Sequence, residues 1–185
     1  MSRFKLDVTM TAADYTEYNL FHQLRSPYGV KRMIAFRITM AVVFLLSATL
    51  TLIYNNFKTD SLLFTIPLIL GLIVVELLIK PFFAIALKRQ IKRLERKGKA
   101  AYAPSSQIEF FDDCIVESTP DARGEFKYTA LERVSVIGTE TIYLHINNIA
   151  AIVLPRSAFS SGEERVEFLR FIKTKCAVFD IYTEA

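Results

Sequence analysis

The side chains that could do chemistry in this sequence are few and far apart. The chain has two cysteines, Cys114 and Cys176, and two histidines, His22 and His145. Nucleophilic catalysis needs a serine or cysteine beside a positioned base. A structural zinc site needs four Cys or His ligands at short spacing. The sequence shows neither pattern, and we expect both thiols to be reduced and to face the cytosol.

Other patterns that carry chemistry also have ordinary explanations. The six glycines are isolated from one another, so no phosphate-cradling loop is predicted. The carboxylate pairs Asp112-Asp113 and Glu163-Glu164 lie in a predicted turn and in the first turn of a predicted helix, where acidic residues are favoured. We therefore expect no enzyme activity, no cofactor and no metal. Activity abolished by a change at His145 or Cys114 would reverse this expectation.

One carboxylate, Glu76, lies inside an otherwise uncharged apolar run, residues 61–79. A carboxylate in a membrane costs free energy unless it is paired or protonated. Lys80 follows four residues later on the same helical face, and a fold-back near residues 57–58 brings Arg37 level with residue 78. The hypothesis is an intramembrane ion cluster of Arg37, Glu76 and Lys80. The alternatives are that each side chain extends to the interface, or that Glu76 has a transport or proton-relay role.

The elements that must position this cluster are two apolar helices. Residues 38–54 carry no charge and residues 61–79 carry one. At 1.5 Å per residue the two runs span about 25 and 28 Å, close to the roughly 30 Å of bilayer hydrocarbon. The sequence predicts a transmembrane hairpin over residues 33–87, with helices at about 33–54 and 61–80. Pro81 should kink the second helix.

Basic residues precede the first apolar helix and follow the second. The loop between the helices, residues 55–60, holds only Lys58 and Asp60. Because cytosolic loops carry the excess of Lys and Arg, we expect both termini in the cytosol. The first ten residues contain no apolar run of signal-peptide type, so the first apolar helix is expected to direct insertion.

A basic juxtamembrane helix and linker is predicted over residues 88–106. Its cations are expected to contact anionic headgroups, each worth about 1 kcal/mol, or to act as a topology-setting stop signal. Residues 1–99 carry a net charge of +9 and residues 100–185 carry −5, so membrane proximity explains the basic pI better than nucleic acid does. The predicted lipid contacts are Lys88, Arg89, Lys92, Arg93, Arg96, Lys97 and Lys99.

The N-terminal segment, residues 1–30, should form a strand and an amphipathic helix. Polar and apolar residues alternate over 4–10, as in a half-buried strand that needs a partner sheet. Thr11 and Asp14 have capping-box spacing, and Ser26-Pro27 should end the helix. One face of the helix is expected to pack on a domain or on the lipid interface: Tyr15, Tyr18 and either His22 or Arg25.

Residues 107–176 contain short strand-like runs separated by turn residues. Ser161 and Glu164 then have the spacing of a cap for a last helix, and residues 177–185 read as a tail. The pattern predicts six or seven strands in a curled antiparallel sheet closed by one helix. Pro155 should lead the chain out of the sheet, and Arg156 is a candidate for the edge that contacts a protein partner.

Four stretches carry a family resemblance: Phe110–Val116, Phe126–Val134, Thr141–Ile146 and Ile152–Ile172. They resemble the bacterial YcxB-like family, membrane proteins whose C-terminal domain looks like a bacterial pleckstrin-homology (PH) barrel. The resemblance implies an α+β membrane protein with a transmembrane hairpin and a PH-like antiparallel β-barrel or sheet closed by one α-helix. It transfers no catalytic residue. Acidic residues in the first hairpin, Asp112, Asp113 and Glu117, disfavour a phosphoinositide site there.

These features together predict a two-pass protein of the bacterial inner membrane. Its noncatalytic PH-like domain would bind or regulate a protein partner in the cytosol. The alternative is an accessory or immunity-type protein that acts on a toxin or transporter through its helix pair. The expected partners are the anionic inner leaflet and an unidentified protein, with no nucleic acid, and homo-oligomerisation is left open.

Overall fold

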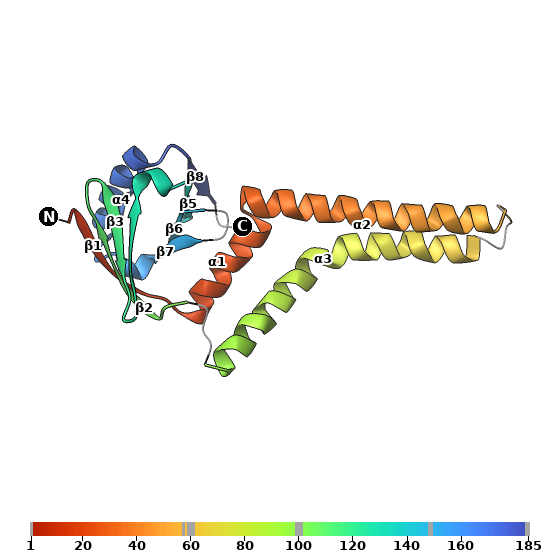
Figure 1. The fold of residues 1–185 in the computed structure, drawn as a ribbon, viewed down its shortest axis with the longest axis horizontal. Helices are drawn as coiled ribbons and strands as arrows, with labels where there is room; N and C mark the ends of the chain where they lie inside the picture. The colour runs from red at the N-terminus through yellow and green to blue at the C-terminus, as the bar shows by residue number, and fades with distance from the viewer. Residues whose placement is uncertain (1, 57, 59–61, 99–101, 148–149, 184–185) are drawn as a thin grey trace. The chain divides into compact units, whose positions relative to one another are not determined.

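The computed structural model describes residues 2–56, 58, 62–98, 102–147 and 150–183. The chain divides into two compact units (Figure 1). We call Asn19–Arg93 the helical unit, and Met1–Tyr18 with Leu94–Ala185 the mixed unit. Helices α1 (Ala12–Leu24) and α3 (Leu62–Arg96) each contribute residues to both units.

In the helical unit, α1 ends just before α2 (Pro27–Tyr54) begins. The Ser26 hydroxyl accepts a hydrogen bond from the Gly29 backbone N–H at 3.0 Å, and Pro27 occupies the first turn of α2. This is a favoured helix start, because proline needs no donor there and serine satisfies a free N–H. The Ser26-Pro27 pair, predicted to end the first helix, therefore also begins the second.

Helices α2 and α3 run side by side in opposite directions (Figure 1). Phe44 lies against Gly71, where an added Cβ would be 3.3 Å from the Phe44 Cε1 atom. Ala48 and Thr65 are buried. Small residues at these positions allow the helices to approach closely, as in membrane helix pairs.

The apolar surface of both helices is largely uncovered. The most apolar window of α2 is 6% buried and that of α3 is 0% buried, whereas the core helix of a soluble protein is mostly covered. Both helices are long and apolar enough to cross a membrane. Helix α3 continues through Pro67 and Pro81, and Figure 1 shows it bending where its colour passes from yellow to green. The bend agrees with the kink predicted at Pro81.

The first sheet of the mixed unit has the order β1-β2-β3-β4. Its strands are β1 (Phe4–Thr9), β2 (Ser105–Phe110), β3 (Cys114–Ser118) and β4 (Arg123–Lys127), all antiparallel. Alternate β1 residues are buried, as their polar–apolar pattern predicted. Thr9 pairs with Ser105, so β2 begins inside the segment that the sequence assigned to a linker.

The second sheet has the order β7-β6-β5-β8. Strands β5 (Arg133–Ile137), β6 (Thr141–His145) and β7 (Ala151–Pro155) are antiparallel neighbours, and β8 (Phe179–Tyr182) pairs parallel to β5. The segment 177–185, predicted as a tail, thus contributes a strand. The sheet is mixed, where the sequence predicted a purely antiparallel one.

Helix α4 (Gly162–Lys175) packs into the core of the mixed unit. Phe168 is fully buried, and its ring lies 5.4 Å from that of Phe4 and 4.8 Å from that of Phe110. The α+β class predicted from sequence is confirmed. Among the described residues no strand pairing joins the two sheets, so the closed barrel suggested by the resemblance is not found.

The start of α1 packs on the second sheet within the mixed unit. The Tyr18 ring lies 5.2 Å from that of Tyr143 and 6.4 Å from that of His145, and Tyr15 stacks on Tyr102 at 5.0 Å. The predicted aromatic face of α1 therefore packs on the domain. Because α1 covers this face of β6, His145 is buried where a half-solvated strand would have left it exposed.

Candidate functional site

The two membrane-length helices carry an ion pair between them. The Arg37 Nε lies 3.2 Å from Glu76 Oε2, and the Arg37 Nη2 donates to the Glu76 backbone oxygen at 3.1 Å. About a third of each side chain is exposed, 35% for Arg37 and 32% for Glu76. The guanidinium therefore meets both the charge and a backbone acceptor of α3. Arg37 therefore links α2 to α3 through two contacts with one residue.

Lys80, the third member of the predicted cluster, lies elsewhere. Its side chain is exposed and makes no ion pair with Glu76. A lysine one turn away needs its flexible stem to reach the carboxylate, whereas the Arg37 guanidinium approaches it directly. The structure thus brings together two of the three residues.

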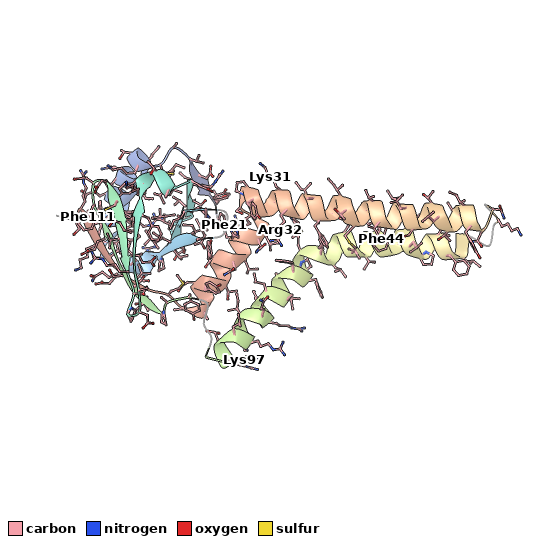
Figure 2. All side chains as sticks on the ribbon, in the orientation of Figure 1. Phe21, Lys31, Arg32, Phe44, Lys97 and Phe111 are labelled. Carbon is pink, nitrogen blue, oxygen red and sulfur yellow. The ribbon has the colours of Figure 1, made fainter. Side chains whose placement is uncertain are left out.

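The predicted lipid-contacting cations lie along the second half of α3 and just beyond its end. Six of them are exposed: Lys88, Arg89, Lys92, Arg93, Arg96 and Lys97. Lys97 follows the last helical residue (Figure 2). Lys99 lies outside the described residues.

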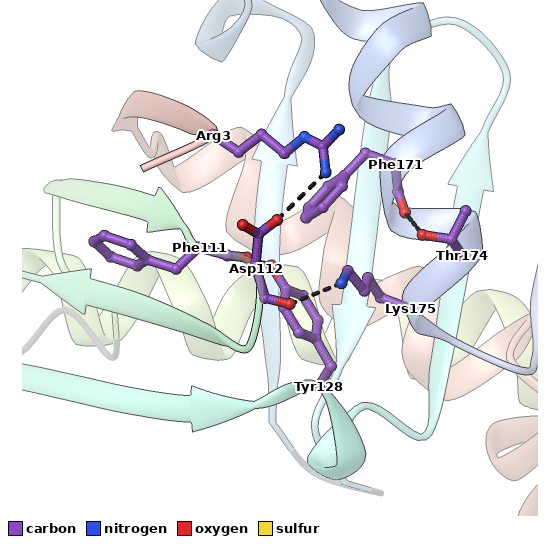
Figure 3. Close-up of polar contacts among 7 residues, drawn as sticks. All are labelled: Arg3, Phe111, Asp112, Tyr128, Phe171, Thr174 and Lys175. Atoms are coloured by element: carbon purple, nitrogen blue, oxygen red, sulfur yellow. Dashed lines mark hydrogen bonds and ion pairs between the residues drawn. The ribbon is translucent and has the colours of Figure 1, made fainter. Parts of the chain in front are cut away.

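The tip of the β2–β3 hairpin is held by neighbouring side chains (Figure 3). Arg3 Nη1 lies 3.3 Å from Asp112 Oδ1, and the Lys175 ammonium donates to the Asp112 backbone oxygen at 2.7 Å. The Tyr128 hydroxyl donates to the Phe111 backbone oxygen at 2.7 Å. Arg3 and Lys175 thus both contact the tip of this hairpin.

A polar pocket of about 420 Å³ lies where β7 leads through the short η3 helix (Arg156–Ala158) into α4. We call it the arginine pocket, and its lining residues are Thr139, Arg156, Phe159, Ser160, Ser161, Gly162 and Arg165. Ser161 caps α4 by accepting from the Glu164 N–H at 3.1 Å. The start of a helix attracts negative charge.

Two guanidiniums meet in the arginine pocket. Arg156 is 63% exposed and its partner Glu140 is 3.8 Å away, a distance at which an exposed pair contributes little. Burial, with the nearby Arg156 cation, lowers the pKa of Arg165 from its ordinary value. Arg165 Nη2 donates to the Gly138 backbone oxygen at 3.4 Å, and among the described residues nothing accepts from its Nε.

Two neighbouring guanidiniums can bind one anion between them. An anionic group between Arg156 and Arg165 would relieve the repulsion of two like charges. The sequence indicated Arg156 but not Thr139 or Arg165, which are 17 and 9 residues away from it in the chain. Only the β5–β6 turn, where Gly138 meets Arg165, brings these parts together.

The two cysteines have different surroundings. Burial raises the pKa of the Cys114 thiol, with smaller contributions from Asp113 and Glu125, which reduces its thiolate fraction. Cys176 is buried in the core. Within the described ranges, no group of three His, Cys, Asp or Glu side chains could hold a metal ion together.

Two uncovered apolar helices joined to a folded α+β domain are consistent with a membrane protein. Residues 110–172 match the family model described as YcxB-like protein, which confirms the resemblance over β3 to α4. No curated protein and no solved structure matches the chain.

Proposed function

We propose that this chain is a two-pass protein of the bacterial cytoplasmic membrane that displays a noncatalytic, PH-like binding domain in the cytosol. In this proposal, both termini lie in the cytosol, and the arginine pocket binds an acidic segment of a protein partner. The observation that carries the proposal is the pairing of Arg156 and Arg165 beside the α4 N-terminus.

The membrane placement is supported by the two helices and their charges. Both have membrane length and uncovered apolar surface, and the Lys and Arg residues flank the hairpin on its open side. Positive charge is retained on the cytosolic side of membranes. The hairpin then leaves the mixed unit, which contains the N- and C-terminal segments, in the cytosol.

A protein ligand is favoured by the chemistry of the arginine pocket. Its lining combines two guanidiniums, hydroxyl groups and the Phe159 ring. Such a surface can pair with carboxylates while covering apolar atoms of a peptide, and arginine is enriched at binding hot spots. The weak Arg156–Glu140 pair, 3.8 Å long and exposed, can be exchanged for a partner's carboxylate.

The test is cross-linking in intact membranes from a photoreactive residue placed at Thr139. We expect it to join one protein partner, and the same probe at Lys127, which is exposed on β4 of the other sheet, to give none. Arg156→Glu should lower the cross-link about tenfold, as expected for reversing one close charge contact. Lys127→Glu is the matched control and should leave it unchanged. Equal loss in both reversals would show that net charge, and not the arginine pocket, is responsible.

The second candidate function acts through the helix pair, and the Arg37–Glu76 ion pair between the spans favours it. The two candidates separate when residues 33–87 are replaced by an unrelated two-helix anchor. The first predicts that the Thr139 cross-link survives the exchange. Loss of function with the cross-link retained would instead assign the activity to the hairpin.

A further inference from the structure

The two membrane helices separate on the side of the basic residues, and a groove opens between them. It has a volume of about 300 Å³ and lies wholly within the helical unit. We call it the interhelical groove. The groove is lined by Gln23, Gly29, Arg32, Met33 and Phe36 from α1 and α2, and by Ile79, Phe82 and Phe83 from α3.

The walls of the interhelical groove are apolar, and its one charged side chain is a cation. Arg32 lies among Phe36, Ile79 and Phe82. Figure 2 shows Lys31 and Arg32 on opposite sides of α2, with Arg32 on the side of α3. Two neighbouring cations of α2 are thus placed differently, and only Arg32 lines the groove.

The surface continues along α3 as a stripe that shares Phe82 with the groove. The stripe lines a second, open hollow of about 520 Å³ and consists of Phe82, Ile85, Ala86, Arg89, Gln90 and Arg93. These positions follow helical spacing, with apolar residues first and arginines last. From Ile79 to Arg93 the rise is about 21 Å, enough for one acyl chain of a leaflet about 15 Å deep together with a headgroup.

The charge along this surface is mainly positive: Glu76 and Glu95 flank it, and Glu76 is already paired with Arg37. Residues 19–37 contain four Lys or Arg and residues 77–94 contain five, and neither range contains an Asp or Glu. A second copy of the helical unit, with ten Lys or Arg against two Asp or Glu, would bring mainly positive charge to the arginines. A lipid with an anionic headgroup brings both an apolar chain for the walls and a phosphate for the cations.

We infer that the interhelical groove and the adjoining stripe bind one anionic phospholipid. The acyl chain lies along Phe36, Ile79 and Phe82, and the phosphate contacts Arg32 with Arg89 or Arg93. The inference rests on the membrane placement in the proposed function and is independent of the arginine pocket. It assigns a specific site where general headgroup attraction would treat all the cations of α3 alike.

The experiment is native mass spectrometry of the full-length protein in detergent. Phosphatidylglycerol is added, and phosphatidylcholine with the same acyl chains is the reference. We expect one phosphatidylglycerol molecule per chain and at least tenfold weaker binding of phosphatidylcholine. Arg32→Gln should weaken phosphatidylglycerol binding about tenfold, the effect of losing one charge-assisted contact. Lys31→Gln removes the same charge outside the groove and should change binding less than twofold.

Two further pairs test the stripe and the wall. Arg89→Gln with Arg93→Gln should weaken binding, whereas Lys88→Gln with Lys92→Gln, equal in charge but outside the stripe, should not. Phe82→Ala should weaken it more than Leu77→Ala, since both side chains are 72% exposed but only Phe82 lines the groove. Circular dichroism confirms that each variant keeps its helices.

Several results would overturn the inference. Equal effects within the matched pairs would show that the general surface charge, and not the groove, binds the lipid. Equal binding of phosphatidylcholine and phosphatidylglycerol would show that the headgroup is not recognised. A dimer that forms in place of the lipid complex would assign the groove to a second copy. The Thr139 cross-link is measured in the same variants. Lipid binding that stays unchanged in Arg32→Gln while the cross-link is retained rejects the groove and leaves the proposed function standing.

Discussion

Separating the charges of Arg37 and Glu76 should weaken the hairpin by an amount that the geometry sets. Unit charges 3.2 Å apart attract by about 1.3 kcal/mol at the dielectric constant of water and about 5 kcal/mol at an effective value of 20. Because the pair lies about one helical turn from the predicted cytosolic end of the hairpin, where water can screen both charges, we expect the lower half of this range. A coupling free energy of about 2 kcal/mol follows.

The two single variants should differ in cost. Glu76→Gln keeps the hydrogen bond from Arg37 to the backbone oxygen of residue 76, and should cost about 2 kcal/mol. Arg37→Gln removes that bond as well and leaves the carboxylate unpaired, for about 3 kcal/mol. The double variant should cost about 3 kcal/mol, well below the sum, because the two changes remove one shared interaction.

Reversible unfolding of the purified protein in bicelles measures all four free energies. Lys80→Gln is the control, since Lys80 is exposed and makes no ion pair with Glu76, and it should cost less than about 0.5 kcal/mol. Additive costs for the Arg37 and Glu76 variants would refute the reasoning. So would a Lys80 effect as large as that of Arg37, which would restore the three-residue cluster.

Three other perturbations have defined outcomes. Burial raises the pKa of Tyr18 from 10.0 to about 12. The unfolded chain therefore loses the Tyr18 proton first, and the free energy of unfolding falls as the pH rises through this range. In thermal unfolding, the Tm of Tyr18→Phe should fall less over the same range. A Cβ at Gly29 would overlap the His22 backbone oxygen, whereas one at Gly162 meets nothing within 4 Å. In denaturant unfolding, Gly29→Ala should lower the free energy of unfolding by about 3 kcal/mol and Gly162→Ala by less than about 1 kcal/mol. Burial raises the pKa of Glu117 from 4.5, so the folded state binds this proton more tightly than the unfolded chain does. The free energy of unfolding therefore falls as the pH rises from 4.5 through the pKa of the folded state. Glu117→Gln should raise the Tm at neutral pH, and Glu125→Gln, at an exposed position on β4, should not.

Features fixed by neighbours in the sequence could be predicted. The cap at Thr11 forms as its spacing from Asp14 indicated, with the Thr11 N–H donating to Asp14 Oδ2 at 2.8 Å. The cap at Ser161 likewise follows from its spacing to Glu164. The polar–apolar alternation predicted strand β1, and the length of the two apolar runs predicted the two long helices. Both patterns are local properties of the sequence. That Arg37 and Glu76 lie at similar heights along the two helices was predicted from the helical rise and the position of the loop alone.

Features that depend on distant parts of the chain could not be predicted. Strand β8 lies in a segment without strong alternation, and it is ordered by parallel pairing of Val134 with Phe179 and by the ion pair of Arg133 with Asp180. Arg165 joins its pocket only because the β5–β6 turn meets α4. The sequence holds these residues but gives no rule for their distance in space.

The hairpin topology is tested most directly by adding protease to one side of sealed vesicles that contain the chain, tagged at each end. We expect both tags to be removed from the same side, with residues 62–80 protected from either side. Tags removed from opposite sides, or a chain released from the vesicles without detergent, would contradict the account.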